Sequence, residues 1–86
     1  MYTVDSKAFG GMFALPVSVA DNFLLLSSGD LLKVVVFAFR NADREFSVED
    51  VSAGTGLSAA DASDALIYWE QKGLIKNRDA QTEKNE

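Results

Sequence analysis

Two serines, each followed three residues later by an aspartate, flank a glycine-rich turn in the second half of this chain. The two pairs are Ser47 with Asp50 and Ser58 with Asp61, and the turn is Gly54-Thr55-Gly56. In such a capping box the serine oxygen accepts hydrogen bonds from amides in the first turn of a helix, and the acid complements the helix dipole. The pattern therefore predicts a helix-turn-helix, with its second helix over Ala59–Lys72 and a left-handed cap at Gly73.

The charge of this region is the opposite of what a DNA-binding surface needs. From Ser47 to Gly73 there are five acidic residues and one basic residue, a net charge of −4 against −5 for the whole chain. Base recognition favours Arg, Lys, Asn or Gln near the start of the second helix, where this chain has Asp61 and Asp64 among alanines and serines. We therefore expect weak or absent DNA binding through this domain. The candidates for weak nucleic-acid contact are Lys72, Lys76 and Arg78.

The segment Leu31–Phe39 can be interpreted in two ways. Its Val-Val-Val-Phe run favours a strand by propensity. However, Lys33 and Arg40 are seven residues apart, so they share one face of a helix but would lie on opposite faces of a strand. This spacing predicts a helix from about Asp30 to Asn41, capped by Ser28 or Gly29 and apolar over most of its circumference. One layer of neighbours in a small domain rarely covers such a helix, so a second subunit is an attractive partner.

The rest of the fold is predicted from shorter signals. Pro16 ends an extended run and begins a short helix over Val17–Leu26, in which Val19, Phe23 and Leu26 share a face. The fold class is mainly α, a winged helix-turn-helix with an extra N-terminal strand and helix and a small β component. The predicted strands are Met12–Leu15, Glu45–Phe46 and Leu74–Lys76. The predicted core comprises Phe23, Leu32, Val35, Phe39, Val51, Leu57, Leu66, Trp69 and Leu74.

Length and composition exclude several classes of function. The 86 residues suffice for one domain, residues 1–76, followed by a polar tail or linker start at 77–86. Without Cys or His, the chain has no disulfide, thiolate or imidazole with which to bind zinc or catalyse acid–base chemistry. No carboxylate pair combines spacing with an apolar setting. We therefore expect no catalytic residue, no metal site, no cofactor and no enzyme activity.

An uncharged stretch, Ala8–Ala20, leaves a signal peptide as an alternative to a cytoplasmic location. Against it, Asp5 and Lys7 precede the stretch, and Gly10-Gly11 and Pro16 interrupt it. No run approaches the roughly 20 apolar residues of a transmembrane helix. We therefore expect a cytoplasmic protein that does not bind a membrane.

The order of these elements and their amino-acid sequences resemble the N-terminal domain of the DnaD family of bacterial replication proteins, over about residues 9 to 76. The segment Tyr68-Trp69-Glu70-Gln71-Lys72-Gly73-Leu74-Ile75 carries the most distinctive part of the likeness. The other matching stretches are Phe13-Ala14-Leu15-Pro16, Asp21-Asn22-Phe23-Leu24-Leu25-Leu26 and Leu32-Lys33-Val34-Val35-Val36-Phe37. The resemblance implies a self-associating module that acts in primosome assembly, with DNA binding carried mainly by a separate C-terminal domain.

The resemblance and the apolar N-terminal segment together predict self-association, as a homodimer or a higher homo-oligomer. The Met12–Leu15 strand is a candidate edge for pairing with its copy in a second chain. The alternative is that the Phe9–Phe13 segment folds back over its own helices and completes one core. The candidate self-association residues are Phe9, Met12, Phe13, Ala14 and Leu15, and a second patch, for other replication-initiation proteins or higher assembly, is Ile67, Tyr68 and Gln71.

Two functions remain open at this point. The first is a non-enzymatic oligomerisation and protein-interaction module of a DnaD-like replication-initiation (primosome) protein. The alternative is a small winged-helix transcriptional regulator whose Ala59–Lys72 helix enters the major groove. In either case, helical spacing with Ala62, Ala65 and Leu66 predicts that Trp69 belongs to the core and does not stack on bases.

Overall fold

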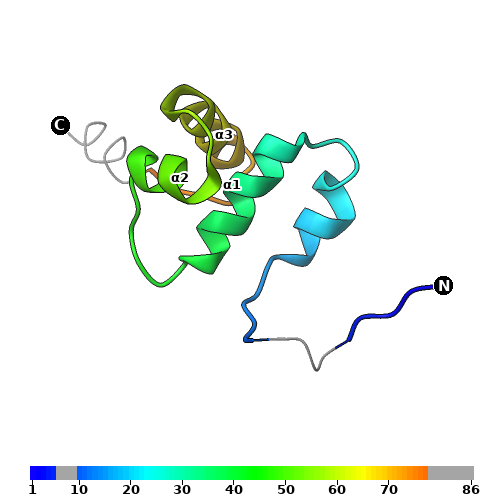
Figure 1. Cartoon of the computed structure of the whole chain (residues 1–86). Helices are drawn as coiled ribbons and strands as arrows, with labels where there is room; N and C mark the ends of the chain where they lie inside the picture. The colour runs from blue at the N-terminus through cyan, green and yellow to red at the C-terminus, as the bar shows by residue number, and fades with distance from the viewer. Residues whose placement is uncertain (6–9, 78–86) are drawn as a thin grey trace.

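A computed structural model describes residues 1–5 and 10–77, which fold mainly into helices (Figure 1). The elements are η2 (Val19–Phe23), α1 (Gly29–Arg40), α2 (Val48–Thr55) and α3 (Ala59–Gln71). The three α-helices contact one another pairwise and form a small three-helix bundle. Residues 1–5 lie apart from this bundle in Figure 1. None of the described helices is long and apolar enough to cross a membrane.

The helix α1 confirms that the valine-rich segment is helical despite its strand propensity. The Ser28 side chain caps it by accepting a hydrogen bond of 3.3 Å from the amide of Leu31. Val34 and Val35 are fully buried, whereas Lys33, Val36 and Arg40 are exposed on the opposite side. Burial of the valine face against α2 and α3 therefore outweighs the weak intrinsic cost of β-branched residues in a helix.

The two capped helices predicted on either side of the glycine-rich turn are present as α2 and α3, with one difference between their caps. At α2 the capping box is complete, because the Asp50 amide donates to Ser47 Oγ (3.1 Å) and the Ser47 amide donates to Asp50 Oδ2 (3.0 Å). At α3 only the serine half is made, a bond of 3.1 Å from the Asp61 amide to Ser58 Oγ. The structure therefore contains one complete capping box where the sequence predicts two.

Glycines end both helices of this unit. Gly56 is left-handed, with φ of 80°, and α2 extends through Thr55, so the turn begins later than predicted. Gly73 is also left-handed, with φ of 84°, and ends α3 as predicted. There the Gly73 amide donates to Glu70 O (3.0 Å) and the Leu74 amide to Trp69 O (3.1 Å), the two bonds of a Schellman motif.

The predicted β component is wrong for the described residues. Met12–Leu15, Glu45–Phe46 and Leu74–Lys76 are all non-helical, but none forms a strand. A strand is stable only when its backbone groups pair with another strand, and these segments have other contacts. The Leu74 amide is already bonded to Trp69 O, and the Phe46 ring packs edge-on against Phe37 at 5.6 Å. The segments that would form a wing therefore pack as loops.

The core centres on Trp69, as predicted. Val34, Val35, Val51 and Trp69 are the largest fully buried side chains. The Trp69 indole donates a hydrogen bond of 2.7 Å to the carbonyl oxygen of Leu31, which joins the end of α3 to the start of α1. The other predicted core residues are partly buried against this cluster: Phe23, Leu32, Phe39, Leu57, Leu66 and Leu74.

The N-terminal helix is shorter than predicted. Residues 17–23 are helical, including the π-helical turn η2, and residues 24–26 form a turn. Val19 is buried and the Phe23 ring meets the Trp69 ring edge-on at 5.5 Å, as expected for the inner face. Leu26 is 85% exposed, so the prediction that it shares this face is wrong. The helix ends before Leu26 can turn inward.

Candidate interaction surfaces

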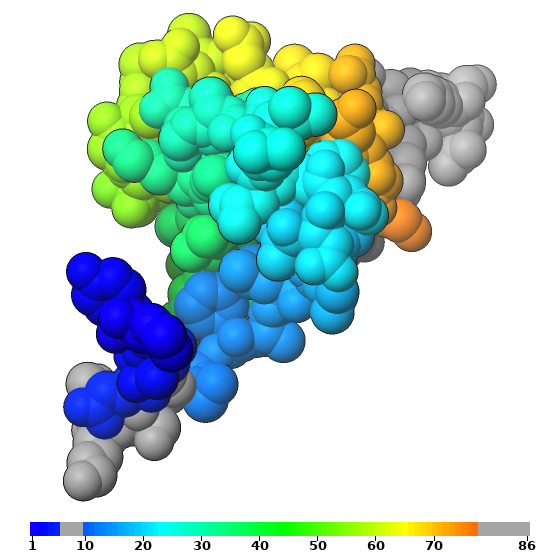
Figure 2. All heavy atoms as spheres, turned by 90° about the vertical axis from the view of Figure 1, so that its right-hand side faces the viewer, coloured from blue at the N-terminus to red at the C-terminus, as the bar shows by residue number. Residues whose placement is uncertain are grey.

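An apolar surface covers the N-terminal part of the molecule, and we call it the leucine face. Figure 2 shows residues 10–28, coloured from blue to cyan, spread over one side of the protein. Leu25 is 91% exposed and lies in the turn between η2 and α1. The exposed apolar side chains that define this face are Met12, Phe13, Leu15, Val17, Leu24, Leu25 and Leu26. Soluble monomers rarely expose contiguous apolar patches of large area.

The leucine face is attached to the bundle through its inner side. Val19 and Phe23 pack on the core, and the Ser27 amide donates to Phe23 O at 3.0 Å. The side-chain hydroxyl of Ser27 is buried and has no hydrogen-bond partner. Because the helix ends at Phe23, the leucines that follow lie in a turn and stay exposed.

A shallow groove of about 520 Å³ lies beside this face, along the exposed side of α1, and we call it the α1 groove. Leu32, Val36 and Phe37 supply its apolar floor. Among the described residues that line it, Lys33 and Arg40 are the charged ones, and both are positive. The remaining lining residues are Phe13 from the N-terminal segment, Gly29 from the start of α1, and Gly54 and Thr55 from the end of α2.

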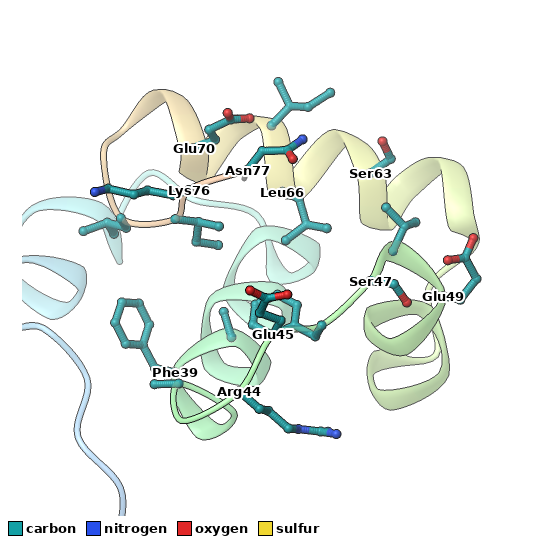
Figure 3. A pocket seen from close by; sticks show the side chains of 17 residues that line it. Phe39, Arg44, Glu45, Ser47, Glu49, Ser63, Leu66, Glu70, Lys76 and Asn77 are labelled. Atoms are coloured by element: carbon teal, nitrogen blue, oxygen red, sulfur yellow. The ribbon is translucent and has the colours of Figure 1, made fainter. Parts of the chain in front are cut away.

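A second groove, of about 620 Å³, occupies the place where the wing was predicted (Figure 3). It lies between α3, the loop that joins α1 to α2, and the segment after Gly73. Glu45 lies near the middle of the view, with Glu70 and Lys76 towards one end and Glu49 towards the other. Charges of both signs therefore line this groove: Arg44, Glu45, Glu49, Glu70 and Lys76.

The predicted self-association residues lie together on the surface. Met12, Phe13, Ala14 and Leu15 are exposed and belong to the region of the leucine face. Phe9 lies outside the described residues. The alternative is that the Phe9–Phe13 segment folds back over the chain's own helices. Within that segment, Phe13 is 44% exposed and lines the α1 groove together with residues of α1 and α2.

The predicted second patch on α3 is divided between two environments. Ile67 is 48% exposed and Gln71 is exposed. Tyr68 is half-buried because its ring packs edge-on against Trp69 at 5.0 Å, with the Lys72 Nζ 5.2 Å from the Tyr68 ring centroid. The structure therefore leaves Ile67 and Gln71 more open to a partner than Tyr68.

The residues proposed for weak nucleic-acid contact do not surround the start of α3. Lys72 and Lys76 are exposed at its far end, and Arg78 lies outside the described residues. Asp61 and Asp64 are exposed in the first turns of α3, where a DNA-reading helix presents donors to base edges. In the described part of the chain, no three acidic residues are grouped so that they could hold a metal ion.

Comparisons with protein-family models, with characterised proteins and with solved structures gave no match. The interaction surfaces are therefore interpreted from their own chemistry. Sequence reasoning missed two of their features, the exposure of the leucine run 24–26 and the α1 groove. The Ser27-Ser28-Gly29 break directly after the leucines was the available signal, because a helix that ends there leaves them on a turn.

Proposed function

We propose that this domain is a non-enzymatic self-association module of a DnaD-like replication-initiation protein. The observation that carries the proposal is the leucine face, with Leu25 and Leu26 almost fully exposed at 91% and 85%. Burying one leucine side chain contributes about 1.5–3 kcal/mol, so a few such residues offset much of the cost of bringing two chains together, about 4–15 kcal/mol. A second copy of the chain carries the same face and can cover it symmetrically.

The replication context rests on the resemblance of the segments around Phe23, Val35 and Trp69 to the DnaD N-terminal domain. Helical structure at Val34–Phe37 and the buried Trp69 agree with that expectation. The missing strands are a difference from the winged helix that the resemblance implies. Co-purification of the native protein with replication-initiation proteins from its own cells tests the context. Recovery without any replication protein would argue against it.

Self-association is tested by light scattering and sedimentation over a range of concentrations. We expect a dimer for the native chain and a monomer, or a dimer at least tenfold weaker, for Leu25→Ser. The matched control is Ile67→Ser, which removes an exposed apolar side chain from α3 and is expected to leave the dimer intact. A native chain that stays monomeric up to high concentration would refute the proposal. If Ile67→Ser weakens the dimer and Leu25→Ser does not, the interface lies on α3 and not on the leucine face.

The transcriptional-regulator alternative keeps one supporting observation, the helix-turn-helix geometry of α2 and α3. The acids at the start of α3 oppose it, because they repel phosphate and leave no cation beside the bases. We therefore expect no DNA binding tighter than the non-specific range of about 10⁻⁴ to 10⁻⁶ M in a low-salt mobility-shift titration. Micromolar binding that is lost in Lys72→Glu or Lys76→Glu would favour the regulator instead.

A further inference from the structure

The α1 groove and the leucine face carry opposite charges on otherwise apolar surfaces. Lys33 and Arg40 line the groove, and none of its described lining residues is acidic. They are seven residues apart on α1, about 10 Å along the helix axis. An apolar groove with two positive residues fits an apolar ligand that carries a carboxylate.

The leucine face has the complementary composition. Asp21 is the only charged residue between Gly10 and Gly29. It is exposed on η2, with the exposed side chains of Val17 before it and Leu24 and Leu25 after it. The surface is therefore an apolar one with a single carboxylate.

These complementary charges are not paired with one another in the described part of the chain. Asp21, Lys33 and Arg40 form no ion pair or side-chain hydrogen bond with another described residue. All three are exposed. Within the described part of the chain these side chains are therefore open to a partner, and a second copy of this chain supplies both the carboxylate and the groove.

The two surfaces are also adjacent, which matters for symmetry. The turn that carries Leu24–Leu26 leads within three residues to Gly29, which lines the groove. Figure 2 shows residues 20–28 next to the first turns of α1 on the same side of the molecule. When two complementary surfaces lie side by side, a two-fold axis between them allows each chain to fill the groove of the other.

We propose that the self-association interface is reciprocal: η2 and the leucine turn of each chain enter the α1 groove of its partner, and Asp21 pairs with Lys33 or Arg40. This inference rests on the proposed function and adds the register of the interface to it. The apolar side chains supply most of the affinity, and the ion pair selects one arrangement over others that bury the same leucines. The groove floor of Leu32, Val36 and Phe37 is then covered in the dimer.

A charge-swap experiment tests the pairing. Dimer dissociation constants are measured by sedimentation for the native chain, for Lys33→Glu and Arg40→Glu singly, for Asp21→Lys, and for Asp21→Lys combined with each of the other two. We expect Asp21→Lys, and at least one of Lys33→Glu and Arg40→Glu, to weaken the dimer about tenfold or more. In these variants like charges meet across the interface. At least one double variant should recover the native dissociation constant within about threefold.

Lys76→Glu is the matched control for Lys33→Glu and Arg40→Glu, because it changes the net charge by the same amount and sign at an exposed residue that does not line the α1 groove. It should leave the dimer unchanged, and circular dichroism should show equal helix content in all variants. A native dimer that is insensitive to all three reversals would overturn the reciprocal interface and leave self-association standing. Double variants that are weaker than both of their single variants would overturn it as well. A monomeric native chain would overturn both proposals.

Discussion

At the scale of single residues, Trp69 connects α3 to both α1 and the N-terminal segment. It is fully buried, its ring packs edge-on against Phe23 and Tyr68, and its indole N–H is bonded to Leu31 O. Helical spacing was enough to predict its burial. The spacing did not reveal the hydrogen-bond partner, because Leu31 is 38 residues away and the contact depends on how α1 crosses α3.

Trp69→Phe should destabilise the fold by about 2–3 kcal/mol. The substitution leaves a cavity in the core and removes one buried hydrogen bond, which contributes about 1 kcal/mol by itself. Urea unfolding followed by circular dichroism measures the change. Leu66→Met, which conserves volume at a partly buried position on the same helix, is the control and should cost less than about 1.5 kcal/mol. Equal losses in the two variants would contradict a special role for the indole.

Gly54→Ala should also destabilise the fold, although alanine usually improves a helix. A Cβ atom at Gly54 would overlap the Phe37 ring, which is itself held by Phe46. The expected loss is about 1–3 kcal/mol, as for other overpacked sites. Gly29→Ala is the control, because nothing lies within 4 Å of a Cβ there, and it should be neutral or stabilise by up to about 1 kcal/mol in thermal unfolding. A stabilised Gly54→Ala would show that Phe37 moves freely.

At the scale of elements, helices were predictable and strands were not. Helix ends depend on nearby residues: Ser28, Ser47 and Ser58 start helices, and Gly73 stops one. The strands at Glu45–Phe46 and Leu74–Lys76 were predicted from their likeness to a wing, and a wing needs pairing between segments that are distant in sequence. Instead, the Leu74 amide bonds to the end of α3 and the Phe46 ring packs against Phe37. Local sequence patterns do not reveal that these contacts replace strand pairing.

The unequal capping boxes give a prediction at this scale. Asp50→Ala should destabilise the fold by about 1–2 kcal/mol, because it removes both the bond to the Ser47 amide and the favourable interaction with the helix dipole. Asp61→Ala should cost only about 0.3–1 kcal/mol, since the Asp61 side chain makes no such bond and only the dipole interaction is lost. Thermal or urea unfolding of the two variants measures the difference. Equal losses would contradict the observed asymmetry.

At the scale of the whole molecule, the surface is more apolar than a small monomer needs. Sequence reasoning predicted that the N-terminal segment takes part in association, from its apolar residues and the lack of cysteine. It placed the candidate residues at 9–15 and missed the leucine turn at 24–26. Which leucines remain exposed depends on where η2 ends and on how Phe23 docks on Trp69. The Ser27-Ser28-Gly29 break signals the first only approximately, and the second is a contact between residues distant in sequence.

Association of this kind should make thermal stability depend on concentration. A folded dimer is stabilised by mass action, so each tenfold rise in protein concentration should raise Tm by about 3–5 °C for a chain of this size. Differential scanning calorimetry at three concentrations measures the effect. Leu25→Ser should abolish the dependence. A native Tm that is constant over a hundredfold range would show that the folded monomer is the stable unit.

The aromatic cluster around Trp69 has a consequence for how the domain can be studied. The chain has one tryptophan, and its indole meets the ring of Phe23, a residue of the same segment that carries the leucine face. Its emission should therefore lie at short wavelength while η2 stays docked and shift to the red when η2 lifts from α3. Trp69 is thus an intrinsic fluorescent probe of the contact between η2 and α3. Its emission would report a rearrangement of the N-terminal segment on dimer formation without any added label.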